Sequence, residues 1–171
     1  MMVDLEDYDN GKNMEALKKD VTSSPLLSWD FHLNNMSKMS KLYKDITAIK
    51  KLTGKLVLDV DLENELKEND HSIVITDTDL NIEFASSNLF SMTGYLPSEV
   101  IGKTPKIFQG PKTDKEEASK IRAHVNNKEA FEVILVNYRK NKSIYNCRIK
   151  GFPIFDKKGN LVKYVAVEHA A

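Results

Sequence analysis

The sequence predicts an α+β domain with one five-stranded antiparallel sheet over residues 70–171, preceded by a helical extension over residues 1–69. After His71 the spacing of apolar residues changes from the three- and four-residue steps of a helix to the two-residue step of a strand. Two strand-like runs precede a stretch of short helical segments, and three more follow it. Turn-forming residues separate these elements. This order of elements is typical of the α+β class.

The extension is predicted to contain two helices. The first covers residues 14–22 and ends at Ser23. Ser24 is a good N-cap and Pro25 a good first residue for the second helix, which runs towards Gly54 with an alternative break near Asn34-Asn35. Residues 55–70 are interpreted as a connector, with a short helix over 63–69.

One face of the second helix is apolar, with lysines on the opposite side. Its residues recur at three- and four-residue steps: Trp29, Leu33, Met36, Tyr43 and Ile46. This stripe can pack on the chain's own sheet or on another chain. A helix over residues 25–53 would be about 40 Å long, more than a small sheet needs for a cover. Trp and Tyr are also favoured at interfaces, so we expect Trp29, Leu33, Met36 and Tyr43 to contact a second copy or a signalling partner.

The elements of the domain follow in order. Ser72–Thr76 and Asn81–Ala85 are predicted to form a hairpin, followed by a short helix over Ser87–Thr93 that Gly94 ends. Pro97 begins another brief helix, and Asp114 caps a longer one. The remaining three strands are Phe131–Tyr138, Ile144–Phe152 and Leu161–His169.

Composition excludes several classes of function. The 25 basic and 25 acidic residues cancel, so no long-range field recruits nucleic acid or an anionic membrane. The apolar runs are too short to span a bilayer, and the acidic start is unlike a signal peptide, which predicts a cytoplasmic protein. A single cysteine and four scattered histidines argue against a disulfide or a metal site.

The order of the elements and two groups of residues resemble the PAS domain family. Residues 88–95 (NLFSMTGY) with 99–102 (EVIG) resemble its helical segment, and residues 137–140 (NYRK) with 153–156 (PIFD) resemble its closing hairpins. Residues 102–110 (GKTPKIFQG) resemble the G-x-N-C-R-F-L-Q-G signature of the flavin-binding light-oxygen-voltage (LOV) branch.

In LOV photoreceptors the cysteine of this signature forms a light-driven bond to the flavin. The resemblance places Pro105 at that position, and proline offers no nucleophile. Thr104 and Lys106 replace the asparagine and arginine of the signature, whereas Gln109 and Arg122 match the family's remaining ribityl and phosphate contacts.

The resemblance also places ligand-binding residues on the last three strands. Asn137 matches the first flavin-binding asparagine, and the family spacing puts Cys147 rather than Asn146 at the second. Strand alternation supports this register, because the other one would turn Arg148 and Lys150 into the core at a cost of several kcal/mol. In the same register Glu168 stands at the glutamine that senses the flavin, and an ionised carboxylate there could only accept hydrogen bonds.

The resemblance implies a sensory and signalling module that acts through ligand sensing, through protein contacts, or through both. The alternative is a LOV-like photoreceptor that binds flavin without a cysteinyl adduct. The ligand stays open, with flavin mononucleotide (FMN) one candidate. The sequence contains no nucleophile-base pair, metal constellation or phosphate loop, so we do not expect an enzyme.

Overall fold

The computed structural model describes residues 25–54, 60–68 and 70–171. The predicted helix over residues 14–22 lies outside them. The chain divides into two compact units, residues 1–40 and residues 41–171, and the site lies in the second.

Helix α2 (Pro25–Thr53) is continuous. The alternative break at Asn34-Asn35 does not occur, because no glycine or proline follows Pro25 within the helix. Gly54, with a φ of 53°, ends it, and its N–H donates to the carbonyl of Lys50. A second short helix, α3 (Leu62–Lys67), is capped by the carboxylate of Asp61.

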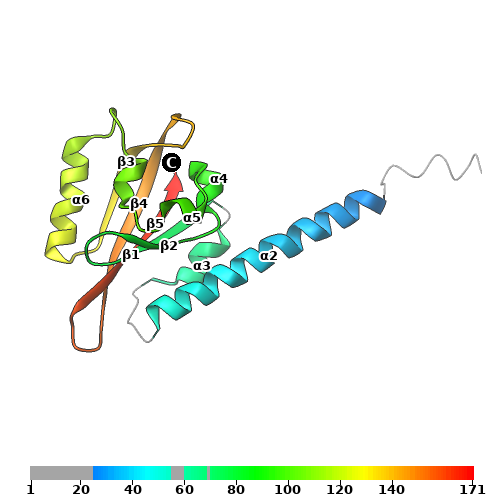
Figure 1. Cartoon of the computed structure of the whole chain (residues 1–171), viewed down its shortest axis with the longest axis horizontal. Coiled ribbons are helices and arrows are strands. Elements are labelled where there is room, and N and C mark those ends of the chain that lie inside the picture. The colour runs from blue at the N-terminus through cyan, green and yellow to red at the C-terminus, as the bar shows by residue number, and fades with distance from the viewer. Residues whose placement is uncertain (1–24, 55–59, 69) are drawn as a thin grey trace, which may run out of the picture. The chain divides into compact units, whose positions relative to one another are not determined.

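The predicted five-stranded antiparallel sheet is confirmed (Figure 1). Its strands are β1 (Ser72–Thr76), β2 (Ile82–Ala85), β3 (Phe131–Tyr138), β4 (Ile144–Phe155) and β5 (Leu161–Ala170). Their spatial order is β2-β1-β5-β4-β3, so that the first and last strands of the chain's domain pair at the centre.

Strand β4 is longer than predicted, since it continues past the predicted end at Phe152 to Phe155. The pairing of β4 with β3 stops at Gly151, and beyond it β4 pairs only with β5. The missing N–H of Pro153 therefore costs no hydrogen bond of the β3 ladder.

Four short helices connect β2 to β3: α4 (Leu89–Thr93), α5 (Pro97–Val100), the 3₁₀ helix η2 (Pro105–Phe108) and α6 (Lys115–Asn127). Gly94 ends α4 in the left-handed conformation, with a φ of 75°. Asp114 caps α6 as predicted, accepting hydrogen bonds from the backbone N–H groups of Glu116 and Glu117.

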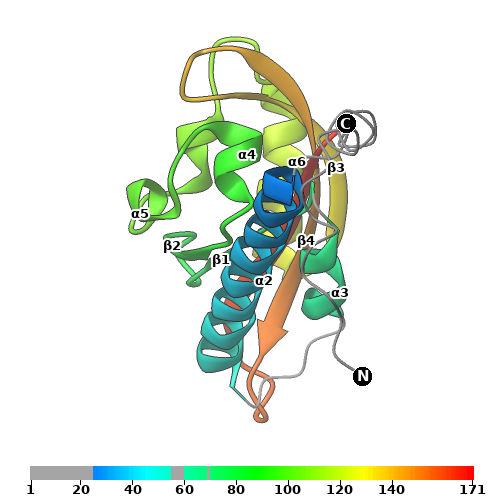
Figure 2. The same cartoon turned by 90° about the vertical axis from the view of Figure 1, so that its right-hand side faces the viewer.

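The sheet buries a separate core on each face. We call inner face the one covered by the helices between β2 and β3, where Leu89, Val100 and Phe108 pack on Val74 and Cys147. The outer face carries a second cluster that includes residues of α2 and α3: Ile49, Leu62, Leu66, Ile73, Ile75, Phe84, Ile154, Val165 and Val167. Figure 2 shows α4 and α5 on one side of the sheet and α3 on the other.

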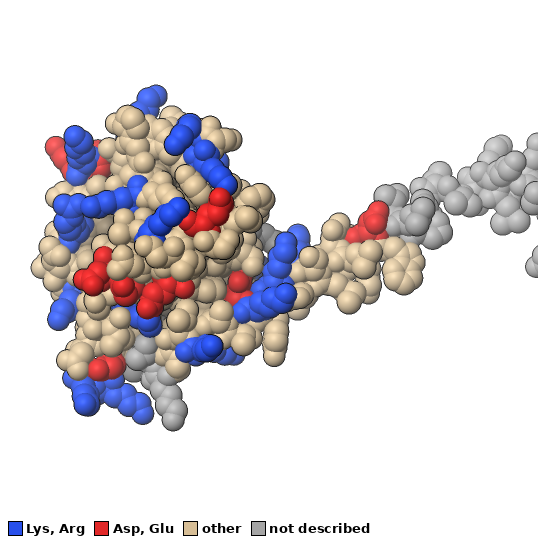
Figure 3. All heavy atoms as spheres, in the orientation of Figure 1, with Lys and Arg blue, Asp and Glu red and all other residues tan. Residues whose placement is uncertain are grey.

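Basic and acidic side chains alternate over the face of the molecule seen in Figure 3, without a large patch of one sign. Surface ion pairs include that of Arg148 with Glu132 at 2.8 Å. Within the described part of the chain, no helix combines the length and the hydrophobicity of a membrane span.

Candidate functional site

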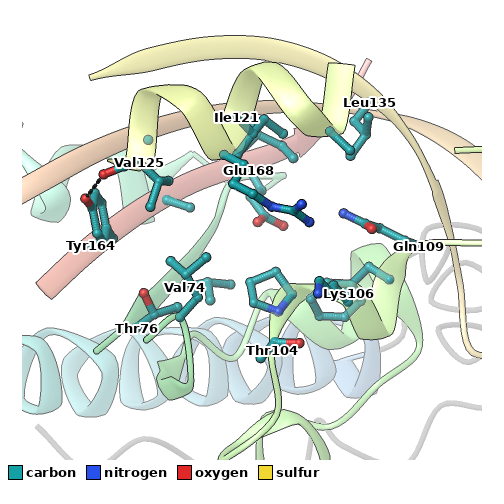
Figure 4. Close-up of a pocket in the computed structure, with 18 of the residues that line it drawn as sticks. Val74, Thr76, Thr104, Lys106, Gln109, Ile121, Val125, Leu135, Tyr164 and Glu168 are labelled. Atoms are coloured by element: carbon teal, nitrogen blue, oxygen red, sulfur yellow. Dashed lines mark hydrogen bonds between the residues drawn. The ribbon is translucent and has the colours of Figure 1, made fainter. Parts of the chain in front are cut away.

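A cavity of about 340 Å³ lies between the inner face of the sheet, helix α6 and the segment around η2. Small-molecule pockets in proteins have volumes of roughly 300–1,000 Å³. Figure 4 shows Ile121 and Val125 of α6 on one side of it and Thr104 and Lys106 on the other, with Glu168 between them. The cavity is therefore large enough for a heteroaromatic ligand.

Local structure explains how these side chains reach the cavity. Strand alternation points every second residue of β1, β3 and β5 inward, among them Val74, Leu135 and Glu168. The turn of η2 directs Thr104 and Lys106, the residues on either side of Pro105, towards the cavity. Tyr164 closes one end by donating a hydrogen bond from its hydroxyl to the carbonyl of Val125.

Six of the seven candidate ligand residues line this cavity. They are Thr104, Lys106, Gln109, Arg122, Asn137 and Glu168. Lys106 and Arg122 are exposed, which places their cationic groups at the rim of the cavity. Asn137 and Glu168 are buried, with 2% and 4% of their surface exposed.

Cys147 differs from the prediction, because it does not line the cavity. It is fully buried in the inner core, among residues such as Leu89 and Tyr145. The predicted strand register is nevertheless correct: Cys147 faces inward, and Arg148 faces outward to pair with Glu132. Strand alternation predicts on which face of the sheet a side chain lies. The packing around Cys147 decides whether a ligand can reach the thiol.

Three buried side-chain atoms have no hydrogen-bond partner among the described residues. They are Ser72 Oγ, Asn137 Oδ1 and Tyr145 Oη. All three residues belong to the inner face, since Ser72 lies directly opposite Glu168, and Asn137 directly opposite Tyr145. Ser72 and Tyr145 had not been predicted, and the pairing of Ser72 with Glu168 is visible only once the strands are aligned.

Burial dominates the acid–base properties of this region. It raises the pKa of Glu168 to about 7, and it raises those of Cys147 and Tyr145 well above their ordinary ranges. The thiol of Cys147 is therefore protonated at neutral pH and a poor nucleophile. Cys147 therefore has the properties of a small buried core residue rather than of a redox-active thiol.

The candidate interface residues of α2 are exposed. Trp29, Leu33, Met36 and Tyr43 have between 57% and 73% of their surface exposed. Ile46, the fifth residue of the predicted stripe, instead packs against the outer core together with Leu42. The second half of α2 thus covers its own sheet.

Comparisons with known proteins agree with this fold. The PAS domain model matches residues 70–169. The chain is 37% identical over 111 residues to Protein TWIN LOV 1 of Arabidopsis thaliana, covering 63% of this chain and 28% of that protein. It is 36% identical over 105 residues to a blue-light photoreceptor of Listeria innocua, covering 57% and 42%. The chain therefore spans less than half the length of these relatives.

Solved structures give the same result. A structure described as "Flavin Analogue Sheds Light on Light-Oxygen-Voltage Domain Mechanism" superposes with a TM-score of 0.60 at 32% identity, covering 66% of this chain and 86% of the other. The dark structure of the blue-light photoreceptor Aureochrome1 LOV gives 0.60 at 30% identity, covering 67% and 86%. The fold, the inner cavity and the family match thus agree that this chain belongs to the PAS domain family, with LOV domains among its relatives.

Proposed function

We propose that this chain is a sensory module that binds a small molecule in the inner cavity and passes the signal on through protein contacts. The observation that carries the proposal is the unpartnered Oδ1 of Asn137, which is buried in the lining of a cavity of ligand size. Leaving such an atom unpaired costs about 1–3 kcal/mol. A ligand with an N–H group facing Asn137 would offset that cost.

Identification of the bound molecule tests this proposal. Native mass spectrometry of the full chain purified from cells should find a small molecule that is lost on denaturation. Asn137→Leu should abolish its retention, whereas Asn146→Leu should not, because Asn146 lies on the exposed side of β4. Equal retention by both variants would contradict the role of Asn137.

Flavin mononucleotide is the ligand that the relatives suggest, since their names include light-oxygen-voltage domains and a flavin analogue. Several features of the cavity fit it. Asn137 can bind the polar edge of a planar ring, Gln109 can bind a sugar hydroxyl, and Lys106 and Arg122 at the rim can bind a phosphate. When bound, a flavin supplies colour and redox chemistry.

We infer that this flavin would form no cysteinyl adduct at the position that the LOV signature uses, because that position is Pro105. Absorbance spectra before and after blue illumination test this inference. A yellow protein without a blue-shifted photoproduct is the expected result. If such a product forms, Cys147→Ser must abolish it, because Cys147 is the single cysteine of the chain.

The output is proposed to pass through α2, whose residues Trp29, Leu33, Met36 and Tyr43 are exposed. Self-association into a homodimer would bury these apolar side chains, and a signalling protein is the other partner to test. Sedimentation of the full chain should show a dimer that Trp29→Asp weakens. Asn34→Asp is the matched control, because it adds the same carboxylate at an exposed polar position of the helix. A chain that stays monomeric at high concentration and recovers no partner from cell extract would overturn this part.

A further inference from the structure

Glu168 is a buried carboxyl group that forms no ion pair with any of the described residues. It lies on β5 and lines the inner cavity, with 4% of its surface exposed. Its one side-chain hydrogen bond within the described parts of the chain comes from the Cys147 thiol, a weak donor at 4.0 Å. An ionised carboxylate in such a place would lack the charge-assisted hydrogen bonds that normally compensate its burial.

The polar and charged groups that face this carboxyl come from each element around it. On the neighbouring strands, Ser72 and the apolar Ile149 lie directly opposite, and Cys147 lies beside it. Across the cavity, Arg122 of α6 and Lys106 of η2 are both exposed at the rim, and neither forms an ion pair with Glu168. Burial therefore acts on the carboxyl without an opposing charge, which favours the neutral acid.

We propose that Glu168 is held as a neutral carboxylic acid and that it determines ligand specificity by donating a hydrogen bond to an uncharged acceptor of the ligand. This inference rests on the proposed function of the cavity and adds a condition that the ligand must meet. The two polar groups of the cavity floor then differ, because Glu168 donates while Asn137 Oδ1 accepts.

The pair selects a class of ligand. Glu168 lies on β5 and Asn137 on β3, with β4 between them, so the two side chains would contact different parts of one ligand. A planar heterocycle with a carbonyl oxygen or an unprotonated ring nitrogen towards Glu168, and an N–H group towards Asn137, satisfies both. An anionic group at this depth would itself be a buried charge, and it would repel the ionised form of Glu168.

The charge of Glu168 can be measured without any ligand. Infrared difference spectra of the full chain between pH 6 and pH 9 should show the carbonyl stretch of a buried protonated carboxyl at the lower pH. Glu168→Gln should remove this band, whereas Glu129→Gln should retain it, because Glu129 is exposed. A spectrum without the band at pH 6 overturns the proposal.

Titration with FMN tests the hydrogen bond itself. Binding to the wild-type chain should be about a hundredfold weaker at pH 9 than at pH 6, as expected for a required proton on a group that titrates near 7. Glu168→Gln retains a hydrogen-bond donor that does not titrate, so its affinity for FMN should depend much less on pH. Because the FMN phosphate titrates in both experiments, comparing the two proteins removes its contribution. Equal pH dependence in both proteins overturns the role of Glu168. Absence of FMN binding at any pH refutes the flavin candidate instead, and the infrared band still decides the charge of Glu168.

Discussion

The outer side of the sheet, where α2 packs, buries the polar side chains of Asp45 and Thr53, and both are hydrogen-bonded. Asp45 accepts from the backbone N–H of Ser87 at 2.8 Å, and Thr53 donates to the carbonyl of Ile49. The inner side also buries polar side chains, but Ser72, Asn137 and Tyr145 each keep an atom without a partner among the residues described.

This difference distinguishes polar groups that are buried for stability from polar groups that are available to a ligand. Polar groups buried for stability are paired within the chain, since an unpaired one costs about 1–3 kcal/mol. A cluster of unpaired groups beside a cavity is consistent with selection for a ligand. The outer side thus holds the fold together, and the inner side retains one unsatisfied atom, Asn137 Oδ1, in the lining of the cavity.

The largest expected effect comes from removing the cover of the outer core. Deleting residues 1–54 removes Ile49 and the partly buried Leu42, Ile46 and Leu52 from the cluster. At about 1.5–3 kcal/mol for a fully buried apolar side chain, the loss should be on the order of 5 kcal/mol. Urea unfolding measures it.

Deleting residues 1–40 is the matched control, because these residues form the other compact unit. It should leave the urea midpoint of the remaining unit nearly unchanged. If both deletions gave the same midpoint, α2 would contribute nothing to the outer core.

The second effect concerns the inner side and depends on pH. The folded pKa of Glu168 is about 7, above the ordinary value of 4.5. Below pH 4.5 the carboxyl group of Glu168 is protonated in both the folded and the unfolded state. Between pH 4.5 and 7 it ionises in the unfolded state but stays neutral in the folded state, so the free energy of unfolding decreases as the pH rises. Glu168→Gln avoids this loss and should be more stable by about 3 kcal/mol at and above pH 7.

Denaturant curves of the wild type and of Glu168→Gln across this pH range provide the measurement. The difference between them should be smallest near pH 4 and should stop growing above pH 7. Parallel stability curves would mean that Glu168 titrates normally in the folded state.

A pair of hydroxyl deletions should change stability in opposite directions. Tyr145→Phe removes an unpaired buried hydroxyl and keeps the ring beneath Arg139, so it should stabilise the ligand-free chain by about 1 kcal/mol. Thr53→Val removes a paired hydroxyl on the α2 side and should destabilise it by about 1 kcal/mol. Thermal unfolding of both variants gives the sign of each change in stability. If both changes had the same sign, the distinction between the inner and outer sides of the sheet would be wrong.

The smallest effect is expected on the exposed part of the outer face. Arg148 pairs there with Glu132 in contact with solvent. Arg148→Gln should therefore cost less than about 1 kcal/mol, as is usual for surface ion pairs. A loss of several kcal/mol in urea unfolding would indicate that Arg148 is buried and that the strand register is wrong.

The positions of the strands, the helix caps and the inward side of β4 could be predicted from the sequence, because each depends on interactions between residues close together in the chain. Asp114 caps α6 and Gly94 ends α4 through local backbone geometry. The inward orientation of Cys147 followed from alternation and from the cost of burying Arg148.

Which inward residues reach the cavity, and which stay unpaired, depends on contacts between segments far apart in the chain. Cys147 and Glu168 both face inward, yet only Glu168 lines the cavity, because helices from the middle of the chain pack over Cys147. The position of Ser72 opposite Glu168 joins residues almost a hundred positions apart. No local pattern encodes such pairings, since they depend on how the first and last strands meet at the centre of the sheet.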